Sequence, residues 1–143
     1  MPGINKVFKF GGASVKDAAA VRNLADIVSS RVSESILLVV SAMGKTTNLL
    51  EKILAEYRRC GGSPDPGTLQ PLVDYHQGIM SGLFPDLFHP VYETVSHLVE
   101  ELRANLEEPE PDYDRHYDRT VCYGELISTS IVSAYLESRG IPS

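Results

Sequence analysis

A lysine, two glycines and a hydroxyl stand together near the start of this sequence, where a short apolar segment ends. Lys9, Gly11, Gly12 and Ser14 fall within seven residues of one another. Glycines let backbone N–H groups approach an anion closely, a helix start adds unpaired donors and a positive dipole, and a lysine adds a full charge. These residues suit a phosphate group, although a Gly-Gly pair between a strand and a helix can also be a plain turn.

The composition is that of one ordinary soluble domain. The chain has 143 residues, of which 43% are hydrophobic and 22% are charged, so it is long enough to bury a core. Its net charge of -6 argues against nucleic acid or an anionic membrane as the main partner. No apolar run approaches the roughly 18 residues of a membrane span, and the N-terminus lacks the layout of a signal peptide. We therefore expect a cytoplasmic protein.

The cysteines and histidines show no metal-site pattern. Cys60 and Cys122 are too few and too far apart for a disulfide framework or a Cys-x-x-Cys site, so we expect free thiols. The four histidines lack the spacing of metal ligands. The sequence therefore predicts no metal ligand in this chain.

Two apolar segments predict parallel strands, at residues 6–10 and 36–40. A helix over 17–30, capped by Ser14 or Asp17, separates them and completes a right-handed βαβ unit. The second segment is apolar throughout, which predicts a strand covered on both faces. A loop over 41–47 and a helix to Arg59 follow. In open α/β sheets ligands bind beyond the carboxyl ends of the strands, where the loops after both segments lie.

The rest of the sequence predicts helices. We expect them over 68–83, 91–106 and 119–138, with Gly140 as a C-terminal cap and an exposed, mobile acidic loop over 107–112. Two strands among about five helices make a small sheet, because sheets usually have about four to six strands. We therefore expect this chain to be the N-terminal part of a longer polypeptide.

Three separated segments resemble the aspartate kinases of the amino-acid kinase family. Residues 7–15 resemble the family's Lys-Phe-Gly-Gly-Thr-Ser-Val signature, with Ala13 in place of threonine. Residues 40–50 resemble its second strand and Thr-Asn-Leu helix start, and residues 123–128 resemble its Gly-Glu helix. Gly44-Lys45-Thr46 is not the end of a Walker A loop, because Val39 occupies the position that needs a glycine.

The resemblance implies an α/β fold, namely a three-layer αβα amino-acid-kinase-like domain that is incomplete here. Residues 1–143 would be the N-terminal part of the catalytic domain, without the nucleotide-binding half and the regulatory ACT domains. The implied reaction is ATP-dependent phosphorylation of the L-aspartate side-chain carboxylate to 4-phospho-L-aspartate, which begins lysine, threonine and methionine biosynthesis.

The resemblance also assigns roles to individual residues. Lys9 would act on the transferring phosphoryl group as the catalytic residue. The implied phosphate-binding residues are Gly11, Gly12 and Ser14, and the implied substrate-binding residues are Ser41, Thr47 and Glu125. Glu125 would hold the α-ammonium group of aspartate, whereas the role of Lys45 stays open between a site contact and a solvent-facing loop lysine.

The full-length enzyme would use ATP and Mg²⁺ and form a homo-oligomer, whereas we expect the isolated chain to be inactive. Two alternatives stay open. Another amino-acid kinase, of the glutamate or carbamate type, would share the lysine and glycine loop. A non-catalytic binding module of the same fold would show no nucleotide dependence.

Overall fold

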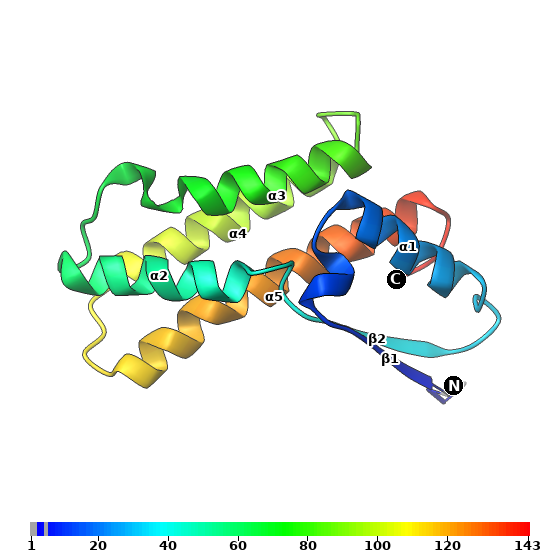
Figure 1. Cartoon of the computed structure of the whole chain (residues 1–143), viewed down its shortest axis with the longest axis horizontal. Coiled ribbons are helices and arrows are strands. Elements are labelled where there is room, and N and C mark those ends of the chain that lie inside the picture. Colours follow the sequence, from blue (N-terminus) through cyan, green and yellow to red (C-terminus); the bar gives the residue numbers. More distant parts are fainter. Residues whose placement is uncertain (1–2, 5) are drawn as a thin grey trace.

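The computed structural model describes residues 3–4 and 6–143, and it contains two strands and five α-helices (Figure 1). In chain order the elements are β1 (Lys6–Phe10), the 3-10 turn η1 (Gly12–Val15), α1 (Ala18–Ser29), β2 (Ile36–Val40), α2 (Thr46–Arg59), the 3-10 turn η2 (Pro66–Leu69), α3 (Gln70–Leu83), α4 (Pro90–Glu107) and α5 (Tyr113–Ser138).

The two strands form a parallel pair with the predicted bounds. Lys6 pairs with Ile36 at one end of the ladder and Phe10 with Val40 at the other. Helices cover one face of this pair, and the other face is open, with Leu37 and Val39 both more than 40% exposed. The prediction that the second strand is covered on both faces is therefore wrong for the described residues, because their helices reach one side of the sheet only.

Helix α1 begins where the sequence predicts a cap. The Asp17 carboxylate accepts a hydrogen bond from the Ala20 amide at 2.8 Å, so Asp17 and not Ser14 is the N-cap. The buried face of the helix carries Val21, Leu24 and Val28, the predicted i, i+3, i+7 set. The capping aspartate thus sets the start of α1, and the apolar spacing sets the side that packs.

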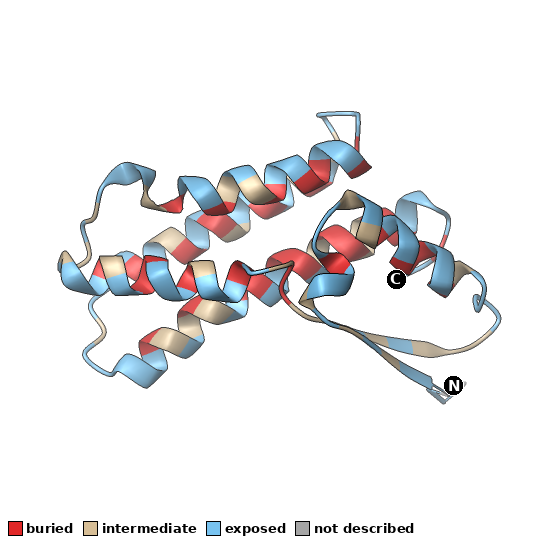
Figure 2. Cartoon of the chain, in the orientation of Figure 1, coloured by how far each residue is buried: buried red, intermediate tan, exposed pale blue. Residues whose placement is uncertain are grey.

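Helices α2 to α5 pack together, and α5 contributes to both hydrophobic clusters that the described residues form. Their buried residues lie on facing sides, whereas the two strands carry no fully buried residue (Figure 2). One cluster joins α1, α3, α4, α5 and the two loops after the strands. The other joins α2, η2, α3, α4 and the first half of α5. Helix α5 therefore connects the sheet end of the molecule to the helical end.

The ends of α5 differ in how well the sequence predicted them. The helix begins at Tyr113, six residues before the predicted start, because Asp112 caps it and His116 already faces the core. Its C-terminus is as predicted. Gly140 has φ +77°, and the Ile141 amide donates to the Leu136 carbonyl at 2.9 Å, as in a Schellman motif.

The acidic loop before α5 is held by arginines. Arg58 donates to the Glu110 carbonyl at 2.9 Å, and Arg119 pairs with the Glu108 carboxylate at 2.8 Å. The Glu110 side chain is only 9% exposed, so the prediction of an exposed loop holds for its neighbours but not for this carboxylate. Cys60 and Cys122 are free thiols, as predicted. Within the described ranges, no helix is both long enough and apolar enough to cross a membrane.

Candidate active site

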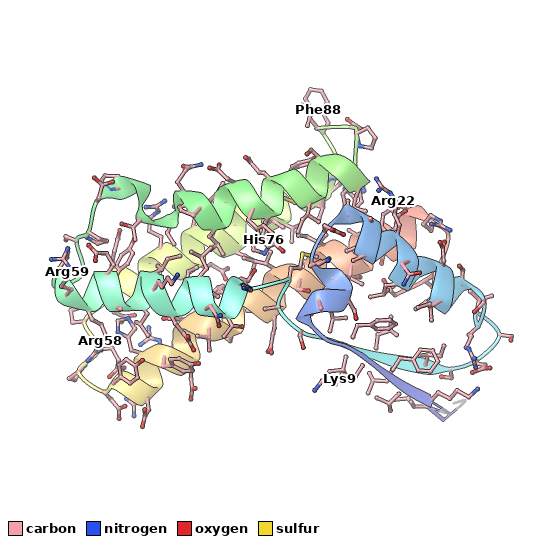
Figure 3. All side chains as sticks on the ribbon, viewed as in Figure 1. Lys9, Arg22, Arg58, Arg59, His76 and Phe88 are labelled. Atoms are coloured by element: carbon pink, nitrogen blue, oxygen red, sulfur yellow. The ribbon has the colours of Figure 1, made fainter. Side chains whose placement is uncertain are left out.

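The lysine and glycine loop continues directly from β1. Lys9 is exposed on the open face of the sheet, and its side chain points away from the helices (Figure 3). Gly11 is extended and precedes the single turn η1, in which the Ser14 amide donates to the Gly11 carbonyl at 2.9 Å. The helix that directly follows the glycines is thus one 3-10 turn and not α1. The N-terminus of α1 is already capped by Asp17, so the loop offers an anion the Lys9 ammonium and its own amides rather than the start of α1.

Gly12 lies against the loop that follows β2. A Cβ atom at Gly12 would stand 2.8 Å from the Gly44 carbonyl oxygen and 2.9 Å from that of Ala42. The Gly44 amide donates to the Gly12 carbonyl at 3.0 Å. Only glycine fits between the two loops, and this explains the second glycine of the pair by packing, independently of any ligand.

The residues after β2 continue the pairing of the strands and meet α5. The Ser41 amide donates to the Phe10 carbonyl at 3.0 Å, and the Ser41 carbonyl accepts from the buried Ser128 hydroxyl at 2.8 Å. Gly124, one turn earlier on α5, packs so closely that a Cβ there would stand 2.9 Å from the Ala42 Cβ. Helix α5 is therefore seated on the loop after β2 through a glycine and a serine.

Hydroxyl and carboxylate groups surround this contact. Thr47 is exposed in the first turn of α2, next to Thr46, whose hydroxyl donates to the Met43 carbonyl at 2.6 Å. Glu125 is exposed on α5 beside Gly124. The structure thus brings the ends of β1 and β2, the start of α2 and the middle of α5 to one place. The residues to which the resemblance assigns phosphate and aspartate binding lie on these elements, and their roles stay a prediction.

The charges of the region suit an anionic ligand with one cationic group. Lys9, Lys16 and Lys45 are exposed on the strand end and the two loops, and Glu125 is the carboxylate of the adjoining helix segment. No cluster of three His, Cys, Asp or Glu side chains among the described residues could hold a metal ion. A Mg²⁺ site needs carboxylate or phosphate oxygens, so the lysine-rich loops do not supply one.

Three contributors to this region were not predicted from the sequence. Ser128 and Tyr75 make hydrogen bonds to loop carbonyls from helices distant in sequence, at Ser41 and Lys16. Gly124 lies in a matched segment, but the sequence gave no reason for a glycine in mid-helix. A mid-helix glycine costs about 1 kcal/mol relative to alanine, and that cost is the signal that could have pointed to a close contact.

Comparisons with known proteins agree with this geometry. The model of the amino acid kinase family matches residues 6–143. Aspartokinase 1, chloroplastic, of Arabidopsis thaliana is 33% identical over 141 residues, covering 97% of this chain. The bifunctional aspartokinase/homoserine dehydrogenase 2 of Escherichia coli is 28% identical and covers 96% of this chain.

Solved structures show the same arrangement. E. coli aspartokinase III, in complex with lysine and aspartate, superposes with a TM-score of 0.75 at 29% identity, covering 95% of this chain and 29% of that one. The same enzyme in complex with aspartate and ADP gives a TM-score of 0.70 at 28% identity, covering 94% of this chain and 29% of that one.

The similarity extends along nearly all of this chain but only part of each relative. The chain spans 24% of the length of the chloroplastic aspartokinase 1 and 17% of that of the bifunctional E. coli enzyme. Because the family model covers residues 6–143, the chain belongs to the amino acid kinase family.

Proposed function

We propose that this chain forms the N-terminal part of the catalytic domain of an aspartate kinase, which transfers a phosphoryl group from ATP to the side-chain carboxylate of L-aspartate. The observation that carries the proposal is the junction of the two loops, through Ser41 to Phe10 and Gly44 to Gly12, with α5 seated on it at Gly124. The proposal is supported by Ser41, one of the residues proposed for aspartate, because its amide bonds to Phe10, the chain neighbour of Lys9.

The chemistry needs positioning more than proton transfer. A carboxylate with an ordinary pKa of about 3.9 is ionised at neutral pH, so the nucleophile requires no general base. The barrier comes from bringing two anions together and from the charge that spreads over the phosphoryl oxygens. In our proposal the Lys9 ammonium and the amides of Gly11 and Gly12 stabilise that charge, and Ser14 adds a polar contact.

We assign the aspartate side of the site to the three residues that the resemblance implies. Ser41 and Thr47 flank the loop after β2 with hydroxyl groups that can donate to a carboxylate, and Glu125 offers an anion to the α-ammonium group. ATP is a substrate in this proposal. Mg²⁺ accompanies ATP and supplies charge neutralisation, but we assign none of its ligands and no step through it to this chain, because the loops carry lysines.

The whole enzyme's properties are proposals as well. We propose that the enzyme is a homo-oligomer that works in the cytoplasm. We also propose that its active site is completed by polypeptide that corresponds to the unmatched part of the relatives. The isolated 143-residue chain should release no ADP, because its lysine-bearing face is open. Turnover by residues 1–143 alone would contradict this expectation.

The test is aspartate-dependent ADP release by the full-length protein, meaning the longest polypeptide that its gene encodes. Lys9→Ala should lower kcat by roughly a thousand-fold or more, because it removes a charge aimed at the transferring group. Its melting temperature should be unchanged, since Lys9 is exposed. Lys52→Ala, on the exposed side of α2, is the matched control and should keep normal activity.

Three results would contradict the proposal. A near-normal kcat for Lys9→Ala would remove Lys9 from the mechanism. ADP release with glutamate or carbamate but not with aspartate would assign the chain to another amino-acid kinase, and calorimetry showing no nucleotide binding at all would leave a non-catalytic module.

A further inference from the structure

Tyr75 of α3 touches both loops of the candidate site. Its hydroxyl donates to the carbonyl of Lys16, the residue that ends the turn η1, at 2.5 Å. The same hydroxyl packs on Gly44 so closely that a Cβ there would overlap with it, and Gly44 has φ +55°. One phenol from outside the βαβ unit thus contacts the end of the glycine loop and the loop after β2.

The position of Tyr75 is fixed by the packing of α3 on α1. Gly82, two turns after Tyr75 on α3, allows close approach, since a Cβ there would stand 2.8 Å from the Ala18 Cβ. Arg22 of α1 donates to the Gly82 carbonyl and lies beside the end of α3 (Figure 3). Ile79, which lies between Tyr75 and Gly82 on α3, is buried in the same cluster as Val15 of η1.

We infer that Tyr75 is a positioning residue that holds the glycine loop and the loop after β2 in the geometry needed for phosphoryl transfer. The inference rests on the proposed function. The two other links between the loops, Ser41 to Phe10 and Gly44 to Gly12, are backbone bonds within the βαβ unit. Tyr75 adds a bond from a third element, and that element is itself anchored to α1.

The chemistry of the phenol suits this role. Burial, and to a lesser degree the nearby Asp17 carboxylate, raise the pKa of Tyr75, so its hydroxyl stays protonated and donates throughout the neutral range. The Lys16 carbonyl is near solvent, so water replaces the phenol when the hydroxyl is removed. Tyr75→Phe therefore frees the end of η1 without leaving a buried polar group unpaired.

The matched control is Tyr92, which makes the same kind of bond elsewhere. Its hydroxyl donates to the Phe84 carbonyl at 2.8 Å, which links α4 to the residue that ends α3, and neither residue belongs to the two loops. Tyr75→Phe and Tyr92→Phe each remove one phenol-to-carbonyl bond, so both should lose similar thermal stability. Only a positioning role makes the two variants differ in catalysis.

In the full-length protein we expect Tyr75→Phe to lower kcat about 3- to 10-fold, the range that one hydrogen bond supports, while KM for aspartate changes less than two-fold. Tyr92→Phe should change neither constant. Amide hydrogen exchange gives a second readout that needs no activity. The Gly44 amide, bound to Gly12, should exchange several-fold faster in Tyr75→Phe and at the wild-type rate in Tyr92→Phe.

The outcomes separate this inference from the proposed function. If the wild-type protein releases no ADP with aspartate, the proposed function fails, yet faster exchange at Gly44 in Tyr75→Phe alone still supports the holding of the loops. Unchanged exchange in Tyr75→Phe overturns the inference. Faster exchange with a normal kcat also overturns it, because Tyr75 would then be structural support only.

Discussion

Replacing Gly124 by alanine tests whether α5 is seated on the loop after β2 as closely as the structure indicates. The added Cβ would stand 2.9 Å from the Ala42 Cβ, 3.2 Å from the Leu50 Cδ1 and 3.3 Å from the Thr46 Cγ2. All three distances are shorter than the optimum of about 3.5–4.0 Å between carbon atoms. The new methyl group therefore forces α5 or the loop to move.

The size of the effect follows from two opposed contributions. Overpacking of this kind costs about 1–3 kcal/mol, whereas alanine in a helix interior gains about 1 kcal/mol over glycine. Gly78 of α3 isolates the second contribution, because a Cβ at Gly78 meets nothing within 4 Å. We expect Gly78→Ala to raise the free energy of unfolding by up to about 1 kcal/mol over the wild type. The free energy of unfolding of Gly124→Ala should be about 2 kcal/mol lower than that of Gly78→Ala.

Urea unfolding of both variants measures this difference. With a denaturant slope of about 2 kcal/mol per M, a gap of about 2 kcal/mol separates the two midpoints by about 1 M. The full-length enzyme adds a second readout, since a shifted α5 moves Glu125 and should raise KM for aspartate. A Gly124→Ala midpoint equal to or above that of Gly78→Ala would refute the close contact. A normal KM in a destabilised variant would refute the role of α5 in holding aspartate.

Two further predictions concern the helical end of the molecule. Arg58→Ala removes the donor to the Glu110 carbonyl, so limited proteolysis between α4 and α5 should become several-fold faster. Arg59→Ala breaks only a surface ion pair and should be cleaved at the wild-type rate. Equal cleavage rates for the two variants would contradict this prediction. Burial lowers the pKa of His76 in the folded chain below the ordinary value of about 6.5 that it has in the unfolded chain. As the pH drops below about 6.5, His76 is protonated in the unfolded chain but stays neutral in the folded one, so the free energy of unfolding falls. Urea unfolding from pH 7.5 to 5.5 should show a smaller loss for His76→Leu, and equal pH dependence would exclude His76.

The sequence predicted most of the fold because the relevant signals are local. The strand at Ile36–Val40 is a continuous apolar run, and α1 combines a capping aspartate with helical apolar spacing. The start of α5 was missed because its first six residues are largely polar. Their helical state depends on the Asp112 cap and on the contacts of His116 with the core and with Arg58. Arg58 is far from His116 in the sequence, so this contact joins distant segments.

The candidate site was predicted only as far as its motifs extend. Lys9, Gly11 and Gly12 lie within four consecutive residues of the chain, so their joint position follows from the chain itself. The reason for Gly12 lies in the carbonyls of Ala42 and Gly44, which are 30 and 32 residues further along the chain, and no spacing rule reveals such a contact. Tyr75 was missed for the same reason, since the sequence predicts a helix over 68–83 but not which loops that helix contacts.

The one error about the sheet bears on the site itself. The apolar run of β2 predicted cover on both faces, and the structure leaves Leu37 and Val39 open on the side that faces away from the helices. In the parallel register Val39 pairs with Lys9, and Leu37 pairs with Val7, which is also exposed. The proposed catalytic lysine therefore rises from an apolar surface. Any group that covers these side chains also lies against Lys9, where it excludes water and strengthens the attraction between the ammonium and a phosphoryl group.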